Sequence, residues 1–354
     1  MKGDEDEEVK YTFPILTLCI GGAQRMLVEI INGLVACGNE VVVLMPPQGV
    51  VEYSLHAAVI RSQQDYTILE EDYPQADIIV SNYYLLVPAA EAASRKGKGI
   101  HIRLSLCYEP TFLPENQVTF PSYHVTPNLI VLSWWQQQII RLNHGIEGYI
   151  VPVGVHPSFQ NMHIRETQAR LQVSAIARNS DGGFSWHRDQ DYLFQQLETV
   201  KHRYPEVEVN LFCPPNEFKY SRTLQRLKAE GFFNVYTPAD DRELIYHYNQ
   251  ADIFVSSSTY DSASLPGLEA MRCGSALVTT YSGGNADYCR HQENCLLSYR
   301  YEGRLAENVM RLIRDPQLRA TLARNGEDEA AKWTWENSVE KFREAVAHIL
   351  HRRA

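Results

Sequence analysis

Residues 252–274 read DIFVSSSTYDSASLPGLEAMRCG and contain, in order, a short apolar run, a loop of small polar residues and a helical pattern. A short apolar run bounded by turn residues predicts a buried strand. The pattern over 264–273 predicts a helix that starts directly after the loop. A strand, a loop and a helix in this order are typical of one βα unit of a parallel sheet.

Similar units fill the rest of the 354-residue chain, which is long enough for two α/β domains. Strands alternating with helices predict parallel sheets with both faces covered, here two Rossmann-like domains. The predicted strands are 11–19, 40–46, 77–81, 100–106, 129–132 and 149–153, then 172–177, 207–213, 234–237, 252–257, 276–279 and 295–297. The predicted helices include 22–37, 133–143, 190–203, 241–250, 264–273 and 303–324.

The division between the domains is expected near 152–157, where two prolines and a glycine interrupt both helix and strand. We therefore predict an N-terminal domain over 1–155, with a disordered acidic tail at 1–10, and a second domain over 156–333. The segment 334–354 predicts a C-terminal helix, amphipathic over about 336–352 and packing back on the N-terminal domain.

Charge and cysteine content exclude several classes of protein. The net charge is -10; residues 1–155 contribute 9 basic and 17 acidic residues (-8), and 156–354 contribute 24 and 26 (-2). Because the protein has no basic patch, we do not expect it to bind nucleic acid. For the same reason it is a weak candidate for docking on an anionic membrane surface. Seven scattered cysteines indicate free thiols. With neither a signal peptide nor a membrane-spanning run, we expect a cytoplasmic protein, or one peripheral at the inner membrane face.

Two carboxylates in the opening stretch, Asp261 and Glu269, are the first candidates for chemistry. Carboxylates accept hydrogen bonds from hydroxyl groups, so this pair suits a ligand with many hydroxyls. The backbone amides around Ser264 and Leu265, at the start of the predicted helix, suit phosphate. The structural alternative is a plain loop in which an acidic residue compensates the helix dipole.

Seven residues separate Asp261 from Glu269, and Ala270-Met271-Arg272-Cys273-Gly274 follow. This segment resembles the E-x7-E region of glycosyltransferase family 4, with Asp261 in place of the usual Glu. The resemblance implies a GT-B fold of two Rossmann-like domains facing across a cleft, and a retaining transferase. It also implies that Glu269 binds the ribose hydroxyls of a nucleotide donor, while Asp261 lies near the donor sugar.

Further segments resemble the same family in the same order along the chain. Gly21-Gly22 is similar to its opening glycine loop, and Arg178 to an arginine that meets the donor diphosphate. Arg188 stands where the family places a lysine, and a guanidinium binds phosphate oxygens in a bidentate manner. Gly283-Gly284-Asn285 resembles a glycine turn whose amides form an anion nest. Surface arginines and ordinary turns remain the structural alternatives.

The acceptor side is expected near the end of the strand 100–106. Tyr108-Glu109-Pro110 resembles a rhamnosyltransferase-like branch of the family, and Glu109 is the candidate acceptor base or hydroxyl ligand. A structural carboxylate is the alternative. Members of the family often have a His near the end of this strand, whereas His101 lies at its start; His124 is the second candidate.

No metal and no cofactor are expected. Asp189-Gln190-Asp191 has the spacing of a metal-binding Asp-x-Asp, but it starts a predicted helix, so Asp189 is interpreted as a helix cap. The Gly-x-Gly-x-x-Gly pattern of nicotinamide enzymes is absent.

These patterns predict metal-independent transfer of a hexose from a nucleoside diphosphate sugar to an acceptor hydroxyl, with retention, in glycan or glycoconjugate synthesis. The expected donors are UDP-, GDP- or dTDP-hexoses, and the expected acceptors are carbohydrates, lipid-linked glycans or proteins. Two alternatives stay open: a GT-B sugar-nucleotide epimerase, and a non-catalytic relative that only binds the sugar nucleotide.

Overall fold

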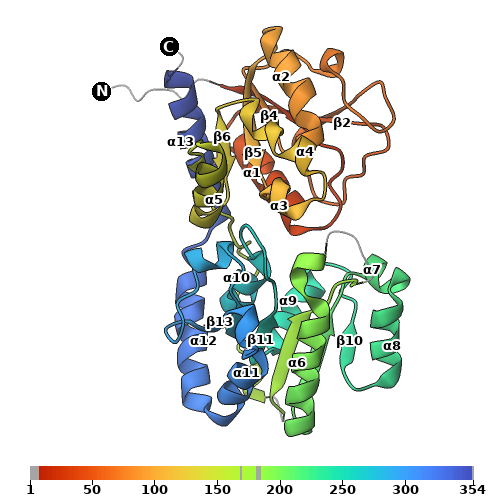
Figure 1. The fold of residues 1–354 in the computed structure, drawn as a ribbon, viewed down its shortest axis with the longest axis vertical. Helices are drawn as coiled ribbons and strands as arrows, with labels where there is room; N and C mark the ends of the chain where they lie inside the picture. Colours follow the sequence, from red (N-terminus) through yellow and green to blue (C-terminus); the bar gives the residue numbers. More distant parts are fainter. Residues whose placement is uncertain (1–7, 168–169, 181–184, 353–354) are drawn as a thin grey trace. The chain divides into compact units, whose positions relative to one another are not determined.

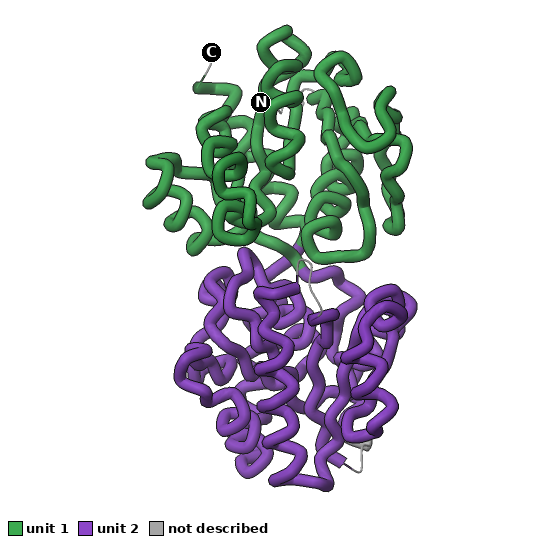
Figure 2. The backbone as a smooth tube through the Cα atoms, turned by 45° about the vertical axis from the view of Figure 1, so that its right-hand side comes forward, with its two compact units in different colours: residues 1–154, 335–354 green, residues 155–334 purple. Residues whose placement is uncertain are grey.

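The computed structural model describes residues 8–167, 170–180 and 185–352. The chain divides into two compact units, one formed by 1–154 with 335–354 and the other by 155–334 (Figure 2). Most of the acidic tail predicted over 1–10 lies outside the described residues, and Lys10 already belongs to the first strand.

The first unit contains a parallel sheet of seven strands in the order β3-β2-β1-β4-β5-β6-β7 (Figure 1). The strands are β1 (Lys10–Pro14), β2 (Glu40–Met45), β3 (Ala58–Arg61), β4 (Ile78–Ser81), β5 (Ile100–Ser105), β6 (Leu129–Val131) and β7 (Tyr149–Ile150). The helices of this unit are α1 (Gly22–Ala36), α2 (Val87–Arg95), α3 (Glu109–Phe112), α4 (Asn116–Thr119), α5 (Trp134–His144) and α13 (Trp335–His351).

The second unit contains a parallel sheet of six strands in the order β10-β9-β8-β11-β12-β13. The strands are β8 (Gln172–Ile176), β9 (Glu208–Phe212), β10 (Asn234–Tyr236), β11 (Ile253–Ser256), β12 (Ala276–Thr280) and β13 (Cys295–Ser298). The helices are α6 (Gln190–Arg203), α7 (Pro215–Tyr220), α8 (Arg222–Glu230), α9 (Asp241–Gln250), α10 (Leu265–Arg272), α11 (Leu305–Arg314) and α12 (Pro316–Ala330). The two parallel sheets confirm the predicted α/β class.

The C-terminal helix α13 packs on the first sheet's unit, as the sequence predicted. The ring of Phe342 lies 6.3 Å from the rings of Tyr11 and Phe13 on β1. Gly33 on α1 allows the helices to approach closely, because a Cβ there would lie 2.2 Å from a methyl group of Val339. The apolar face of α13 is thus part of the core of the first unit.

Some predicted elements need correction. The strand β3 was missed, because it is a mostly exposed edge strand without a clear alternating pattern. The predicted strand 11–19 ends at Pro14. The predicted helix 303–324 is two helices: Pro316 cannot donate to the preceding turn, and the Asp315 carboxylate caps α12 by accepting from the Leu318 amide at 2.9 Å.

Candidate functional site

The stretch 252–274 lies where the sequence predicted, at the carboxyl ends of the strands in the second sheet. Strand β11 lies between β8 and β12. The loop 257–264 leaves the carboxyl end of β11 before α10 begins (β11 and α10 are labelled in Figure 1). In open parallel sheets, ligands bind beyond the carboxyl ends of the strands. The loops after β8, β11 and β12 therefore form the candidate site.

Asp261 is held on both its backbone and its side chain. Its amide donates to the Ser282 carbonyl at 2.7 Å, and its carbonyl accepts from the Gly284 amide at 2.8 Å. Its Oδ1 accepts from the Ser264 amide at 3.1 Å, and its Oδ2 lies 3.1 Å from Nη1 of Arg188. The structure therefore brings together two predicted site residues, Asp261 and Arg188, and it fixes their carboxylate and guanidinium.

The start of α10 is also fixed. Ser264 has a φ of 55°, an uncommon left-handed conformation for a residue with a side chain, and its carbonyl accepts from the Tyr288 hydroxyl at 2.9 Å. Burial raises the pKa of Tyr288 well above its ordinary value, so the phenol stays protonated and donates. Gly267 is needed here, because a Cβ would lie 2.4 Å from that hydroxyl.

Glu269 lies in the second turn of α10 and is buried, with 6% of its surface exposed. Its Oε2 accepts a hydrogen bond from the Tyr248 hydroxyl at 3.1 Å. Burial, and then the neighbouring carboxylate of Glu269, raise the pKa of Tyr248 well above its ordinary value. The carboxylate thus already accepts from a hydroxyl donor, which is the chemistry expected of a ribose ligand.

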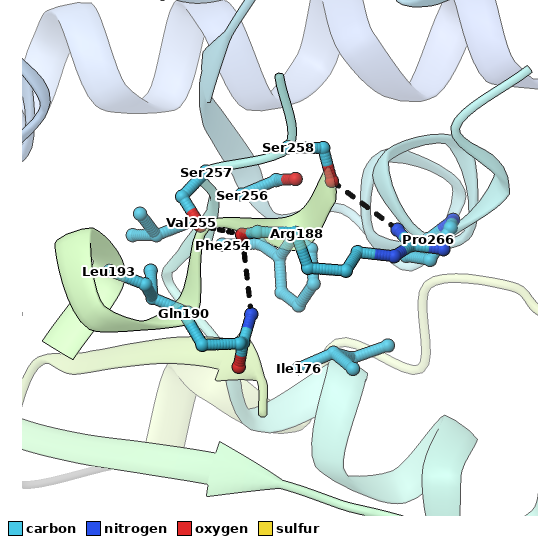
Figure 3. Close-up of a pocket in the computed structure, with 10 residues that line it drawn as sticks. All are labelled: Ile176, Arg188, Gln190, Leu193, Phe254, Val255, Ser256, Ser257, Ser258 and Pro266. Atoms are coloured by element: carbon cyan, nitrogen blue, oxygen red, sulfur yellow. Dashed lines mark hydrogen bonds between the residues drawn. The ribbon is translucent and has the colours of Figure 1, made fainter. Parts of the chain in front are cut away.

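Arg188 lies at the edge of a small cavity (Figure 3). Its Nη1 lies 3.4 Å from Oγ of Ser258, and its carbonyl accepts from Oγ of Ser257 at 2.6 Å. The cavity measures about 20 Å³, room for a single water molecule and far less than a nucleotide needs. Serine hydroxyls of the β11 loop therefore position Arg188, and the cavity itself is no nucleotide site.

Arg178, just after β8, has a partner that sequence reasoning missed. Its Nε donates to Oε1 of Glu217 on α7 at 2.7 Å, and its amide donates to the Gln190 side chain at 2.7 Å. The pair is partly accessible, with 30% of the Arg178 side chain and 25% of the Glu217 side chain exposed. Glu217 lies 39 residues away, so no local pattern indicates this contact.

The roles expected of Gly284 and Asn285 need correction in this structure. The Gly284 amide donates to Asp261 and is not open to an anion. Asn285 is fully buried; its Oδ1 accepts from the Ser282 amide at 3.0 Å and its Nδ2 donates to the Thr280 carbonyl at 2.8 Å. Gly283, directly before Gly284, adopts a φ of 94°. The turn supports Asp261 through its own hydrogen bonds.

The expected cap of α6 also needs correction. Asp189 occupies the N-cap position, but its side chain makes no capping hydrogen bond and its φ is 45°. Its carboxylate instead forms an ion pair with Arg300, whose guanidinium carbon lies 3.6 Å from the centre of the Tyr192 ring. The tertiary ion pair has replaced the local cap.

In the first unit, Gly21 is the N-cap of α1 and Gly22 is the first residue of that helix. The Gly21 amide donates to the Tyr53 hydroxyl at 2.8 Å. Gly22 is exposed, and a Cβ there would have no heavy atom within 4 Å. Gly22 is therefore the more open of the two positions.

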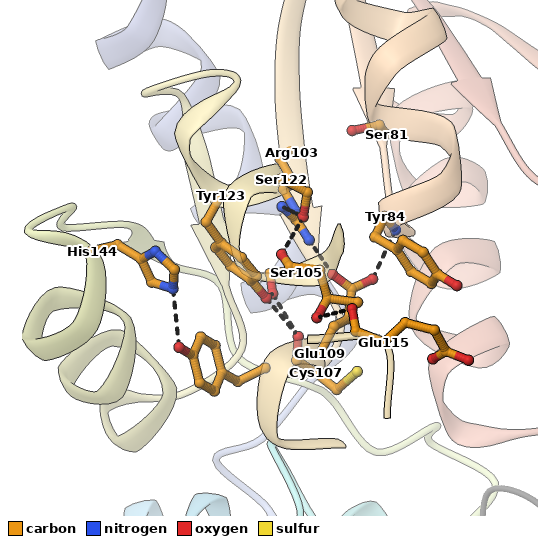
Figure 4. A network of polar contacts seen from close by, with 12 residues as sticks. Ser81, Tyr84, Arg103, Ser105, Cys107, Glu109, Glu115, Ser122, Tyr123 and His144 are labelled. Atoms are coloured by element: carbon orange, nitrogen blue, oxygen red, sulfur yellow. Dashed lines mark hydrogen bonds and ion pairs between the residues drawn. The ribbon is translucent and has the colours of Figure 1, made fainter. Parts of the chain in front are cut away.

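Glu109 is buried and held by structural partners in this structure, which favours the structural alternative over an acceptor base or hydroxyl ligand (Figure 4). Its Oε1 accepts from the Tyr84 amide at 2.9 Å, and its Oε2 is paired with Arg103. The Arg103 guanidinium also lies 3.7 Å from the centre of the Tyr123 ring. Burial raises the pKa of the Glu109 carboxyl against the opposing effect of Arg103.

His101 and the candidate His124 have different surroundings. His101 is buried, and its ring nitrogens contact Ser81 at 2.8 Å and Glu91 at 3.0 Å; burial lowers its pKa. His124 is exposed, and its Nε2 lies 3.1 Å from Nδ1 of His144. Burial, and then His124, lower the pKa of His144 to about 4.

Within 8–167, 170–180 and 185–352, no group of three or more His, Cys, Asp or Glu side chains is arranged to hold a metal ion. No helix in the same part of the chain has the length and apolar character needed to span a bilayer.

The edge where the strands of the second sheet end brings together the Glu269 carboxylate, the Asp261–Arg188 pair and Arg178. Residues 182–329 match the family described as "Glycosyl transferases group 1".

Sequence relatives match part of the chain. The D-inositol 3-phosphate glycosyltransferase of Acidothermus cellulolyticus is 32% identical over 115 residues, which are 31% of this chain and 25% of that protein. The putative glycosyltransferase YtcC of Bacillus subtilis is 27% identical over 171 residues, 45% of this chain and 42% of that protein. The chain thus matches 25% of the length of the first relative and 42% of the length of the second.

Solved structures resemble the chain over nearly its whole length. Sucrose-phosphate synthase from Thermosynechococcus elongatus has a TM-score of 0.79 and 17% identity, covering 98% of this chain and 100% of that one. Anabaena HepE, solved in complex with UDP and glucose, has a TM-score of 0.76 and 17% identity, covering 96% and 100%. These similarities show the GT-B fold.

Proposed function

We propose that the chain is a glycosyltransferase that moves a hexose from a nucleoside diphosphate sugar to an acceptor hydroxyl. The observation that carries this proposal is the arrangement of Glu269, Asp261 and Arg188 at one sheet edge. The match of residues 182–329 to the glycosyl transferases group 1 family supports it. No separate observation favours an epimerase or a non-catalytic binding protein.

The donor nucleotide is assigned to α10. Glu269 presents a buried carboxylate that accepts a hydroxyl hydrogen bond in this structure, and the ribose of a donor offers two such hydroxyls. Asp261 lies eight positions earlier, fixed by the 282–284 turn, and is assigned to the donor sugar. Amides near Ser264 and Leu265 are assigned to the phosphates at the start of this helix.

In the proposed reaction, the bond between the anomeric carbon and the β-phosphate oxygen breaks, and a bond to the acceptor oxygen forms. The electron pair of the broken bond stays on the diphosphate, so the cations Arg178 and Arg188 would stabilise the leaving group. The acceptor proton passes to the leaving phosphate oxygen. Attack from the same face as the leaving group gives retention, and this scheme assigns no step to a metal ion.

The chemistry of the site and the named relatives narrow the choice of donors and acceptors to test. UDP-glucose is the first donor to test, because HepE has been solved with it. GDP- and dTDP-hexoses follow, the latter because Tyr108-Glu109-Pro110 resembles the rhamnosyltransferase-like branch. Carbohydrates, lipid-linked glycans and proteins are the proposed acceptor classes, and inositol phosphate joins the panel because of the named relatives. We place the reaction in the cytoplasm, in glycan or glycoconjugate synthesis.

The test is transfer of radiolabelled sugar from each donor to an acceptor panel, with product stereochemistry determined by NMR. We expect one donor to give a new product with the anomeric configuration of the donor. Conversion of the donor to its epimer without any acceptor would instead identify an epimerase. Nucleotide binding without turnover across the panel would favour a binding protein, and an inverted product would contradict retention.

A further inference from the structure

The most informative contact outside the expected site residues is the one that Glu217 makes at the end of β8. Oε1 of Glu217 accepts from Nε of Arg178 at 2.7 Å and is also paired with Nη2 of the same guanidinium. Oε2 accepts from the Asn179 backbone amide at 2.9 Å. Both oxygens of one carboxylate are therefore bound by a guanidinium and the next amide in the chain.

A guanidinium beside a backbone amide is a binding arrangement for any anion with two oxygens. Phosphate and carboxylate oxygens use the same donors, and Arg is well suited to both. We call the donors of Arg178 and Asn179 the Arg178 anion site. In this structure the site is occupied by a side chain of the protein itself.

Another anion can replace the Glu217 carboxylate at this site, because the ion pair is not buried in the core. A quarter or more of each side chain is exposed, so water screens the pair and its net contribution is small. The backbone of Arg178 is anchored separately, because its amide donates to Gln190 at 2.7 Å. Removing the Glu217 charge therefore leaves Arg178 held at its amide while its guanidinium becomes available.

We propose that Glu217 is an internal competitor for the donor diphosphate at the Arg178 anion site, so that donor binding displaces its carboxylate. This inference rests on the proposed function, which assigns the donor diphosphate to Arg178. It gives Glu217 a specific effect: the residue weakens binding of diphosphates and makes the site prefer ligands with enough negative charge to displace it. A residue that merely orients Arg178 would have the opposite effect on affinity.

The experiment measures the affinity of inorganic pyrophosphate and of UDP by calorimetry for wild type, Glu217→Gln, Arg178→Gln and the double variant. Glu307→Gln is the matched control, because Glu307 forms an exposed pair with Arg314 in the same unit and the substitution changes the net charge equally. We expect Glu217→Gln to bind both ligands about twofold to fivefold more tightly, the scale of one partly screened ion pair. Glu307→Gln should differ little from wild type, and the gain should vanish when Arg178 is also replaced.

Equal or weaker binding by Glu217→Gln, or a gain that persists without Arg178, would overturn the inference. The sugar-transfer assay separates this failure from failure of the proposed function. If the protein transfers sugar but Glu217→Gln shows no gain in affinity, the proposed transferase function stands and the competitor role of Glu217 is wrong. If Glu217→Gln binds pyrophosphate more tightly in an Arg178-dependent way but no sugar transfer occurs under any condition, the anion site stands and the proposed transferase function is wrong.

Discussion

The Oδ2 atom of Asp261 lies 3.1 Å from Nη1 of Arg188, although the two residues are 73 positions apart and belong to loops after different strands. The two side chains are only 17% and 23% exposed, so the pair is partly shielded from water. The pair joins a carboxylate assigned to the donor sugar to a cation assigned to the diphosphate. Replacing either member of the pair should therefore affect catalysis more than it affects the stability of the fold.

Asp261→Asn tests this coupling. The amide keeps the size of the side chain but removes the charge that faces Arg188, so the guanidinium loses its fixed partner. We expect kcat to fall by about tenfold to a hundredfold, a loss of roughly 1.4–2.7 kcal/mol of transition-state stabilisation. The thermal midpoint should change little, since a partly exposed pair contributes at most about 1 kcal/mol. Steady-state kinetics and thermal denaturation measure the two effects.

Asp328→Asn is the matched control for Asp261→Asn, because Asp328 is exposed on α12. It should leave both kinetics and stability at wild-type values. Full activity in Asp261→Asn would show that the carboxylate has no part in the reaction.

Glu269→Gln should weaken nucleotide binding. The neutral amide offers one acceptor oxygen in place of two and loses the charge that strengthens hydrogen bonds to hydroxyls. We expect the Kd for the nucleoside diphosphate to rise about tenfold to a hundredfold, measured by calorimetry. Tyr248→Phe removes only the hydroxyl that donates to Glu269, so it leaves the charge in place and should have a smaller effect. Unchanged affinity in Glu269→Gln would remove the assignment of Glu269 to the ribose.

Gly284→Ala should destabilise the second unit. An added Cβ would lie 2.0 Å from the Ser262 carbonyl oxygen, a clash with backbone that no rotamer relieves. We expect a loss of about 2–4 kcal/mol in the free energy of unfolding, measured by denaturant titration. Gly22→Ala is the control for stability, because nothing lies within 4 Å of its added methyl group. A Gly284→Ala variant as stable as Gly22→Ala would show that the 282–285 turn can move aside.

The sequence allowed the fold to be predicted well wherever apolar runs are buried on both faces, as at Ile253–Ser256. It allowed the position of Asp261 and Glu269 to be predicted, because both follow that strand directly. It did not reveal Glu217 as the partner of Arg178, since that contact joins the loop after β8 to α7, which follows β9. The pairing of Glu109 with Arg103 was missed for a similar reason, because it depends on the turn after β5, whose conformation no periodic pattern predicts. Glu109 therefore remained a candidate for the acceptor side.

The pH dependence of stability should include His144 as a contributor. Burial and the neighbouring His124 lower its folded-state pKa to about 4, below the ordinary value of 6.5. The unfolded chain therefore binds more protons than the folded one between these values, and stability should fall as the pH drops from about 6.5 toward 4. Because His144 is partly exposed, we expect its share to be only about 1 kcal/mol. Thermal midpoints against pH measure it, and His144→Gln should flatten this part of the profile; an unchanged profile would contradict the assignment.

Chelation tests the metal-free scheme directly. In the proposed reaction, the charge that develops on the diphosphate is stabilised by Arg178 and Arg188, so no divalent ion is needed for the bond to break. Activity measured after dialysis against EDTA should stay within about twofold of the untreated value, a difference of about 0.4 kcal/mol in the barrier. The control adds magnesium back to the dialysed protein, which should give no further increase. Loss of activity in EDTA that magnesium or manganese restores would require a metal ion to share the diphosphate charge, and the two arginines would then be insufficient by themselves.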